Sequence, residues 1–140
     1  MEKKLMNFDI KDGKVPFVKV KHNNIEFNLI LDSGASMSCI DDNIVDLLIH
    51  DDTKKATGGT IFGCGEGENS NPAPIYNIPL TLGKSDFVEE FSSIDFSAMS
   101  KMIKETFGIT VRGLLGNMFF QKHNMILDFN SNEIRYVYKK

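Results

Sequence analysis

The sequence lacks several features that would assign it to a common class of protein. No apolar run approaches the ~20 residues that a membrane-spanning helix needs. The first nine residues mix charges instead of forming the apolar core of a signal peptide. No cluster of Lys and Arg stands out, and the net charge of −3 does not favour nucleic acid. We therefore expect a cytoplasmic protein with neither a membrane nor a nucleic acid as its partner.

Cysteine and histidine are also scarce. The chain has two cysteines, Cys39 and Cys64, and their spacing matches neither a CxxC redox motif nor a set of zinc ligands. We interpret both as free thiols in a reducing compartment, with a single structural disulfide as the alternative. The three histidines, His22, His50 and His123, show no metal-ligand spacing. The sequence thus predicts no bound metal and no cofactor.

What the chain does contain is typical of a single globular domain. Its 140 residues are 41% hydrophobic and 25% charged, and no repeat or linker divides them, so we expect one domain over 1–140. Turn residues and alternating hydrophobicity predict mainly β structure with two to three short helices. The predicted strands are 5–10, 15–21, 25–31, a short one over 37–40, 75–82, 86–94, 109–115, 125–129 and 133–138, and the predicted helices are about 42–50, 97–107 and 117–123.

The most informative feature is an acidic turn at the end of a predicted buried strand. The apolar run Leu29–Leu31 leads directly into Asp32-Ser33-Gly34-Ala35-Ser36. Gly34 allows a sharp turn that a residue with a Cβ would strain. A carboxylate at the end of a buried strand costs free energy unless it is paired or hydrogen-bonded. This cost suggests that Asp32 has a function.

Two glycine-containing segments follow. Residues 56–68 carry five glycines and predict a β-hairpin with a flexible tip. They lack the Lys-Ser/Thr end of a phosphate-binding loop, and Glu66 and Glu68 would repel an anion. The second segment, Gly113-Leu114-Leu115-Gly116, predicts a buried strand that other backbone approaches closely.

Together these features resemble the retropepsin-like aspartic proteases, the single-lobe relatives of pepsin. Asp32-Ser33-Gly34-Ala35-Ser36 matches their active-site signature, the glycine-rich hairpin is similar to their flap, and Gly113–Gly116 is similar to the strand beside their active-site loop. The predicted helix 97–107 looks more like the cellular and bacterial members than the retroviral ones. Asn117 stands where retroviral enzymes have Arg, so the intersubunit salt bridge which that Arg supports is not expected here.

The resemblance implies a mainly β fold, a closed β-barrel-like acid-protease lobe with a flap hairpin. It also implies an aspartic endopeptidase in which two carboxylates share one proton. Because the chain has one Asp-Ser-Gly signature, the pair would come from two protomers of a homodimer that binds an extended polypeptide substrate. The implied residues are Asp32 as the catalytic group, Ser33, Gly34 and Ala35 as loop support, Ile61, Phe62, Gly63, Cys64 and Gly65 as the substrate-binding flap, and Leu114, Leu115 and Gly116 as the strand beside the loop.

Two alternatives stay open. In the first, Asp32 is only a turn residue, and the chain is an inactive dimeric module that binds peptides in the same cleft. In the second, Ser36 and His123 belong to a serine hydrolase, but the last glycine of its nucleophile motif is absent. The intact Asp32 and the glycine-rich hairpin favour the aspartic protease.

Overall fold

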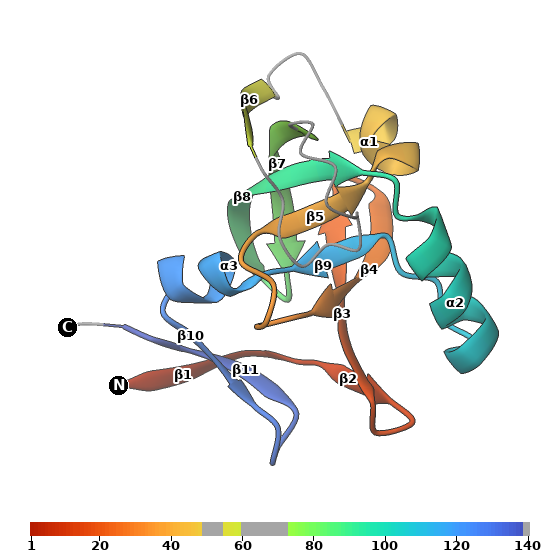
Figure 1. Ribbon diagram of the computed structural model, residues 1–140. Coiled ribbons are helices and arrows are strands. Elements are labelled where there is room, and N and C mark those ends of the chain that lie inside the picture. Colours follow the sequence, from red (N-terminus) through yellow and green to blue (C-terminus); the bar gives the residue numbers. More distant parts are fainter. Residues whose placement is uncertain (49–54, 60–72, 139–140) are drawn as a thin grey trace.

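The computed structural model describes residues 1–48, 55–59 and 73–138. Strands make up most of this part of the chain, and three short helices lie around them (Figure 1). Met1 and Tyr138 lie side by side at the small sheet in the lower part of the view, since the Tyr138 N–H donates to the Met1 carbonyl at 3.1 Å. These observations confirm the prediction of a mainly β fold with short helices.

The larger sheet closes into a barrel. Its strands are β2 (Asp9–Lys11), β3 (Val15–His22), β4 (Ile25–Leu31), β5 (Ser38–Asp41), β6 (Lys55–Gly59), β7 (Ala73–Leu82), β8 (Ser85–Ile94) and β9 (Gly113–Leu115). They are ordered β2-β3-β4-β9-β5-β8-β7-β6, and β3 also pairs with β7 through Lys21 and Thr81. Six strands therefore form a closed ring, as the sequence predicts.

The inside of the barrel is filled by alternating apolar side chains. On β4, Phe27, Leu29 and Leu31 face the core, and polar or less buried residues lie between them. On β7, Ile78 and Leu80 are buried in the same way. Each such side chain contributes roughly 1.5–3 kcal/mol when fully buried, so the register of β4 is well specified up to the residue before Asp32.

A second, three-stranded sheet contains β1 (Glu2–Asn7), β11 (Glu133–Val137) and β10 (Met125–Asp128), in that order. The predicted single strand over 5–10 is therefore wrong, because this segment divides at Phe8 between the two sheets. Phe8 is buried, and its N–H donates to the Asn132 carbonyl at 3.0 Å. Alternation along the chain predicts a strand but does not say which sheet it joins.

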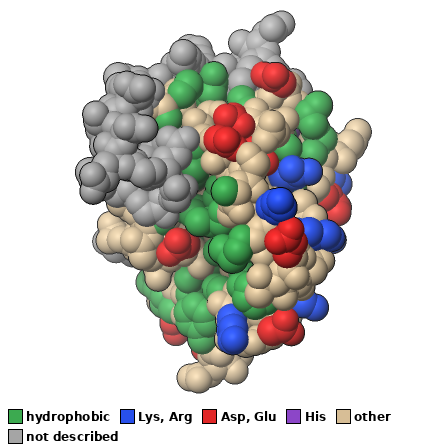
Figure 2. Space-filling model, turned by 45° about the vertical axis from the view of Figure 1, so that its right-hand side comes forward, with side chains coloured by type: hydrophobic (Ala, Val, Ile, Leu, Met, Phe, Trp, Pro, Cys, Tyr) green, Lys and Arg blue, Asp and Glu red, His purple; other side chains and the backbone are tan. Residues whose placement is uncertain are grey.

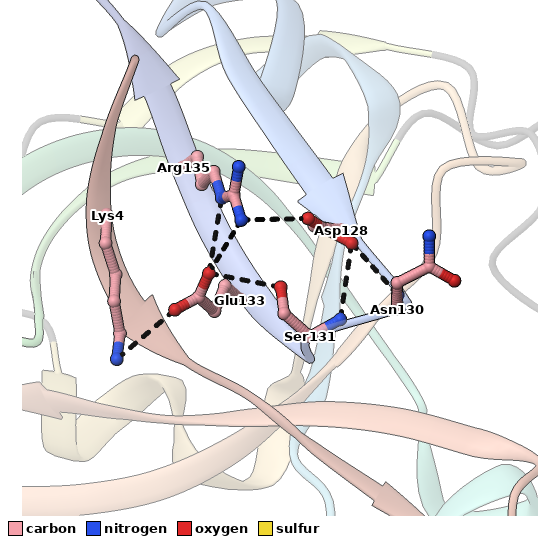
Figure 3. Close-up of polar contacts among 6 residues, drawn as sticks. All are labelled: Lys4, Asp128, Asn130, Ser131, Glu133 and Arg135. Carbon is pink, nitrogen blue, oxygen red and sulfur yellow. Dashed lines mark hydrogen bonds and ion pairs between the residues drawn. The ribbon is translucent and has the colours of Figure 1, made fainter.

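An ion-pair network covers one face of the small sheet (Figure 3). Arg135 lies 3.1 Å from an Asp128 oxygen and 3.0 Å from a Glu133 oxygen, and Lys4 lies 3.4 Å from the other Glu133 oxygen. The backbone N–H of Asn130 is the main group that lowers the pKa of Asp128, and Arg135 adds to this effect. The hydrogen bond from Arg135 is the main cause of the lowered pKa of Glu133.

This network predicts an acid-dependent loss of stability. A carboxyl whose pKa is lowered by folding stabilises the protein above its ordinary pKa, and this stabilisation disappears as the pH falls through its folded-state pKa. Urea unfolding below about pH 5 should therefore show a falling free energy, and Arg135→Gln should reduce that fall. Lys101→Gln removes the same charge from the exposed face of α2 (Ser97–Phe107). This control should leave the fall in the free energy of unfolding unchanged. An equal reduction in both variants would contradict the prediction.

The helices begin and end close to the predicted positions. They are α1 (Asp42–Leu48), α2 and α3 (Asn117–Lys122). α2 ends at Gly108, which has the left-handed φ of 78° that favours glycine at this position. The N-cap of α2 is Phe96, and the N–H of the first helical residue, Ser97, donates to the Asp95 carboxylate at 3.0 Å.

The segment before Gly113 also differs from the prediction. The predicted strand 109–115 is confirmed over Gly113–Leu115 alone. Arg112 instead connects two strands: its N–H donates to the Asn28 carbonyl at 2.9 Å, and its carbonyl accepts from the Asp41 N–H at 2.7 Å. The Arg112 guanidinium also lies 3.4 Å from the buried Asp41 carboxylate. These contacts hold the chain in place just before it enters the barrel as β9.

Candidate active site

Asp32 lies in a tight turn at the end of β4. Its N–H donates to the Leu115 carbonyl at 3.0 Å, and its own carbonyl accepts from the Ala35 N–H at 3.2 Å. Its carboxylate oxygen Oδ1 accepts from the Gly34 N–H at 3.0 Å. These bonds fix both the backbone and the side chain of Asp32 within one short turn, which we call the Asp32 loop (residues 32–36).

The exposure of the Asp32 loop differs from the expectation of a buried carboxylate. Asp32 is half-buried, Ser33 and Gly34 are exposed, and Ala35 is buried. The turn brings the carboxylate out of the apolar strand end to a place where water and a ligand can reach it. Gly34 also allows a close approach, since a Cβ there would lie 3.3 Å from the Asp32 oxygen Oδ1.

β9 lies between the two strands that flank the Asp32 loop. It runs parallel to β4, with Leu114 opposite Ile30, and antiparallel to β5, with Gly113 opposite Ile40. Leu114 and Leu115 are buried. Backbone from a distant part of the sequence therefore lies between β4 and β5 and supports the Asp32 loop.

The connection from β9 to α3 is packed directly against the Asp32 loop. A Cβ on Gly116 would lie 2.5 Å from the carbonyl carbon and oxygen of Met37 and 3.0 Å from the Ala35 carbonyl oxygen. The Asn117 N–H donates to the Ala35 carbonyl at 2.7 Å, and the Met118 N–H donates to the Ser36 carbonyl at 3.3 Å. Gly116 is needed here because backbone occupies the space that any side chain would take.

Two buried polar residues beside this connection were not among the predicted site residues. Ser38 is 2% exposed and Glu89 is 5% exposed. The Ser38 hydroxyl donates to Glu89 at 2.8 Å and accepts from the Gly116 N–H at 3.0 Å. Burial raises the pKa of the Glu89 carboxyl, although the hydrogen bond from Ser38 opposes this effect. The sequence carries a signal for Glu89, because alternation places it between Phe87 and Phe91 on the inward face of β8.

Several predictions concern residues outside the described part of the chain. The flap residues Ile61, Phe62, Gly63, Cys64 and Gly65 all lie there. Cys39 lies inside it, on β5, and is disulfide-bonded, so the interpretation of Cys39 as a free thiol is wrong. The alternative of a structural disulfide therefore holds for Cys39.

The described ranges also bear on metals and membranes. Within them, no three His, Cys, Asp or Glu side chains gather as metal ligands. No helix of these ranges has the length and apolar character needed to cross a bilayer.

The geometry defines what one copy of the site can do. A half-buried carboxylate that accepts one backbone hydrogen bond can act as a general base toward water. Polarising a peptide carbonyl at the same time needs a second, protonated group. Two carboxyl groups about 3 Å apart supply both roles, because they share one proton and titrate as a pair.

The barrel, the Asp32 loop and the inserted strand β9 together form an acid-protease-like fold. No protein-family model matches the sequence, and no curated protein matches it at the sequence level. Among solved structures, the fold is similar to the crystal structure of a retropepsin-like aspartic protease from Rickettsia conorii. The alignment has 16% sequence identity and a TM-score of 0.54, and it covers 97% of this chain and 92% of that one. At this identity the likeness establishes the fold.

Proposed function

We propose that the chain is an aspartic endopeptidase that works as a homodimer, with Asp32 of each copy forming the catalytic pair. The observation that carries this proposal is the Asp32 loop itself. Its carboxylate is accessible, its orientation is fixed by the Gly34 N–H, and its backbone is held by Leu115. An acid-protease-like lobe with this loop supplies one of the two carboxylates that hydrolysis by a shared pair requires.

A second copy of the chain is required by the count of carboxylates. The sequence has one Asp-Ser-Gly turn next to an apolar strand, whereas Asp12-Gly13 has neither the serine nor a bracing strand. In the proposed dimer, the exposed Ser33 braces the opposite loop, and the exposed Gly34 lets the two loops approach closely. Water would be activated by one carboxylate, and the carbonyl would be polarised by the other.

The proposed substrate is an extended, apolar-rich polypeptide that adds a strand to the site. Hydrophobic side chains form a patch through the centre of the face in Figure 2, with basic and acidic side chains beside it. The proposed closing element is the flap, with Ile61 to Gly65 over the substrate.

Two finer proposals concern relatives and location. α2 lies between the flap segment and β9, which supports a closer relation to cellular and bacterial members than to retroviral ones. A cytoplasmic location is a further proposal. The disulfide at Cys39 argues against it, because structural disulfides are rare in reducing compartments. A tagged copy expressed in cells and followed by fractionation would decide the location.

The alternative is an inactive dimeric module that binds peptides with the same fold. The half-exposed carboxylate of Asp32 favours the enzyme, since a module that only binds apolar peptides gains nothing from an accessible, oriented carboxylate. Peptide binding without any cleavage by the wild-type chain, across acid to neutral pH, would support the alternative.

A mixing experiment tests the shared catalytic pair. Wild-type chain is mixed with an equal amount of Asp32→Asn chain, and subunits are allowed to exchange before peptide cleavage is measured. Random pairing should reduce cleavage per wild-type chain to about half, because mixed dimers hold only one carboxylate. Asp12→Asn chain serves as the control and should not reduce it. Unchanged cleavage with the Asp32→Asn chain, from a wild type that is monomeric by sedimentation, would refute the proposal.

A further inference from the structure

The proposed hydrolytic chemistry does not explain why a carboxyl group, that of Glu89, is buried near the Asp32 loop. An ionised carboxylate is costly to bury, and Glu89 is 5% exposed on the inward face of β8. Two donors converge on its two oxygens: the Ser38 hydroxyl at 2.8 Å and the Glu90 N–H at 3.2 Å. Only an ionised carboxylate accepts both bonds with full strength, because an amide or a protonated acid has one good acceptor oxygen.

Ser38 connects Glu89 to the backbone that supports the Asp32 loop. Because its single hydroxyl proton is directed to Glu89, its lone pairs are free for the Gly116 N–H at 3.0 Å. Gly116 is flanked by the two groups that hold the loop: the Leu115 carbonyl on Asp32 and the Asn117 N–H on Ala35. The Ser38 bond is thus a buried side-chain contact to the backbone that supports the loop.

We propose that Glu89 is a positioning residue for Asp32: its carboxylate orients the Ser38 hydroxyl, and this hydroxyl holds the Gly116 backbone against the Asp32 loop. The effect on catalysis rests on the proposed peptidase function, whereas the effect on the backbone does not. In this proposal Glu89 acts on Asp32 through Ser38 and Gly116.

The surroundings of Glu89 make the arrangement sensitive to pH. Ser38 on β5 and Ile78 on β7 carry no charge, Glu90 on its own strand opposes ionisation, and Lys122 on α3 favours it. Burial is the largest influence and raises the pKa of Glu89. When Glu89 takes up a proton, it loses an acceptor, and the hold on Gly116 weakens. A Glu89→Gln variant should behave at every pH like the protonated wild type.

The first test measures amide hydrogen exchange at Gly116 and Asp32 by NMR as a function of pH, corrected for intrinsic exchange. In the wild type, protection of both amides should rise as Glu89 ionises. In Glu89→Gln it should stay at the low level, about tenfold below the ionised wild type. Glu90→Gln, on the exposed neighbour of the same strand, should keep a rise in protection of the same size, moved to lower pH because the Glu90 charge no longer opposes ionisation of Glu89. Protection in Glu89→Gln that titrates as in the wild type would overturn the proposal.

A second pair of variants tests the link through Ser38. Ser38→Ala removes the acceptor of the Gly116 N–H and should lower the protection of Gly116 as Glu89→Gln does. Ser38→Thr keeps the hydroxyl, and a pocket of about 340 Å³ lies beside Ser38, lined also by Met37, Glu89 and Met118. It should restore the protection. Equal protection in Ser38→Ala and Ser38→Thr would overturn the proposal.

Peptide cleavage then separates positioning from a purely structural role. Glu89→Gln should lower kcat about tenfold or more with little change in KM, because substrate binding does not use Glu89. Lower thermal stability with unchanged kcat would mean that Glu89 is only structural and would overturn the proposal. A wild type that cleaves no peptide but shows the Gly116 titration would refute the peptidase function and still support the Glu89–Ser38–Gly116 arrangement.

Discussion

The Asp32→Asn variant should keep its fold and lose about a thousandfold or more in kcat/KM on any peptide that the wild-type chain cleaves. An amide cannot take a proton from water, and it cannot share a proton with a second Asp32. The fold should survive because the substituted amide would still present an oxygen to the Gly34 N–H, the bond that the carboxylate accepts at 3.0 Å. Cleavage of a peptide library, followed by mass spectrometry, measures the loss.

Asp12→Asn is the matched control for this experiment. Asp12 also precedes a glycine in a turn, and its φ of 52° is one that Asn adopts as readily as Asp. It should leave cleavage, thermal stability and oligomeric state unchanged. Equal cleavage by Asp32→Asn and the wild type would remove Asp32 from the mechanism, and equal losses in both variants would point to a general effect of charge.

The second large effect is expected at Gly113, where β9 meets β5. Gly113 has a φ of 154°, which is unfavourable for a residue with a side chain. A Cβ there would overlap the Cys39 carbonyl oxygen and lie 3.0 Å from the Ile40 Cα. Because these atoms are backbone of a buried strand, they cannot move aside. Gly113→Ala should therefore reduce the free energy of unfolding by about 3 kcal/mol or more.

Gly108→Ala separates the two causes of that loss. Gly108 also has a positive φ, 78°, but nothing lies within 4 Å of a Cβ placed on it. Its substitution should cost only the backbone strain, about 1 kcal/mol. Urea unfolding of both variants gives the comparison. Similar losses in the two variants would show that the close approach of β9 to β5 is not what requires glycine at Gly113.

The fold was predictable where local pattern and burial agree. β4 and α2 have the predicted bounds because each buries one regular face, and Gly108 ends α2 in the expected conformation. The division at Phe8 was not predictable, since it depends on a hydrogen bond to Asn132 far along the chain. The shortness of β9 has a similar cause: Arg112 bonds to two different strands instead of continuing one ladder.

The sequence motif of the candidate site was predictable, but the exposure of Asp32 and the buried residues around its loop were not. The turn at Asp32 and the glycines around β9 have fixed sequence signatures. The half-exposure of Asp32 was not predicted, because apolar residues before a carboxylate do not show where the turn directs it. Glu89 was missed although its alternation with Phe87 and Phe91 marks it as an inward-facing acid. Its partner Ser38 has no such mark, because serine is common on either face of a strand.

The insertion of β9 between β4 and β5 also orders the events of folding. Gly116 and Ser38 are joined by a hydrogen bond across 78 positions of sequence. Contacts of such separation form late, because the loop between them must close before they contribute. While the chain is being synthesised, Asp32 emerges early on a turn that has no support from β9. The site can be completed only after β9 has left the ribosome, so the maturation of the Asp32 loop depends on a segment that is synthesised much later than the loop itself.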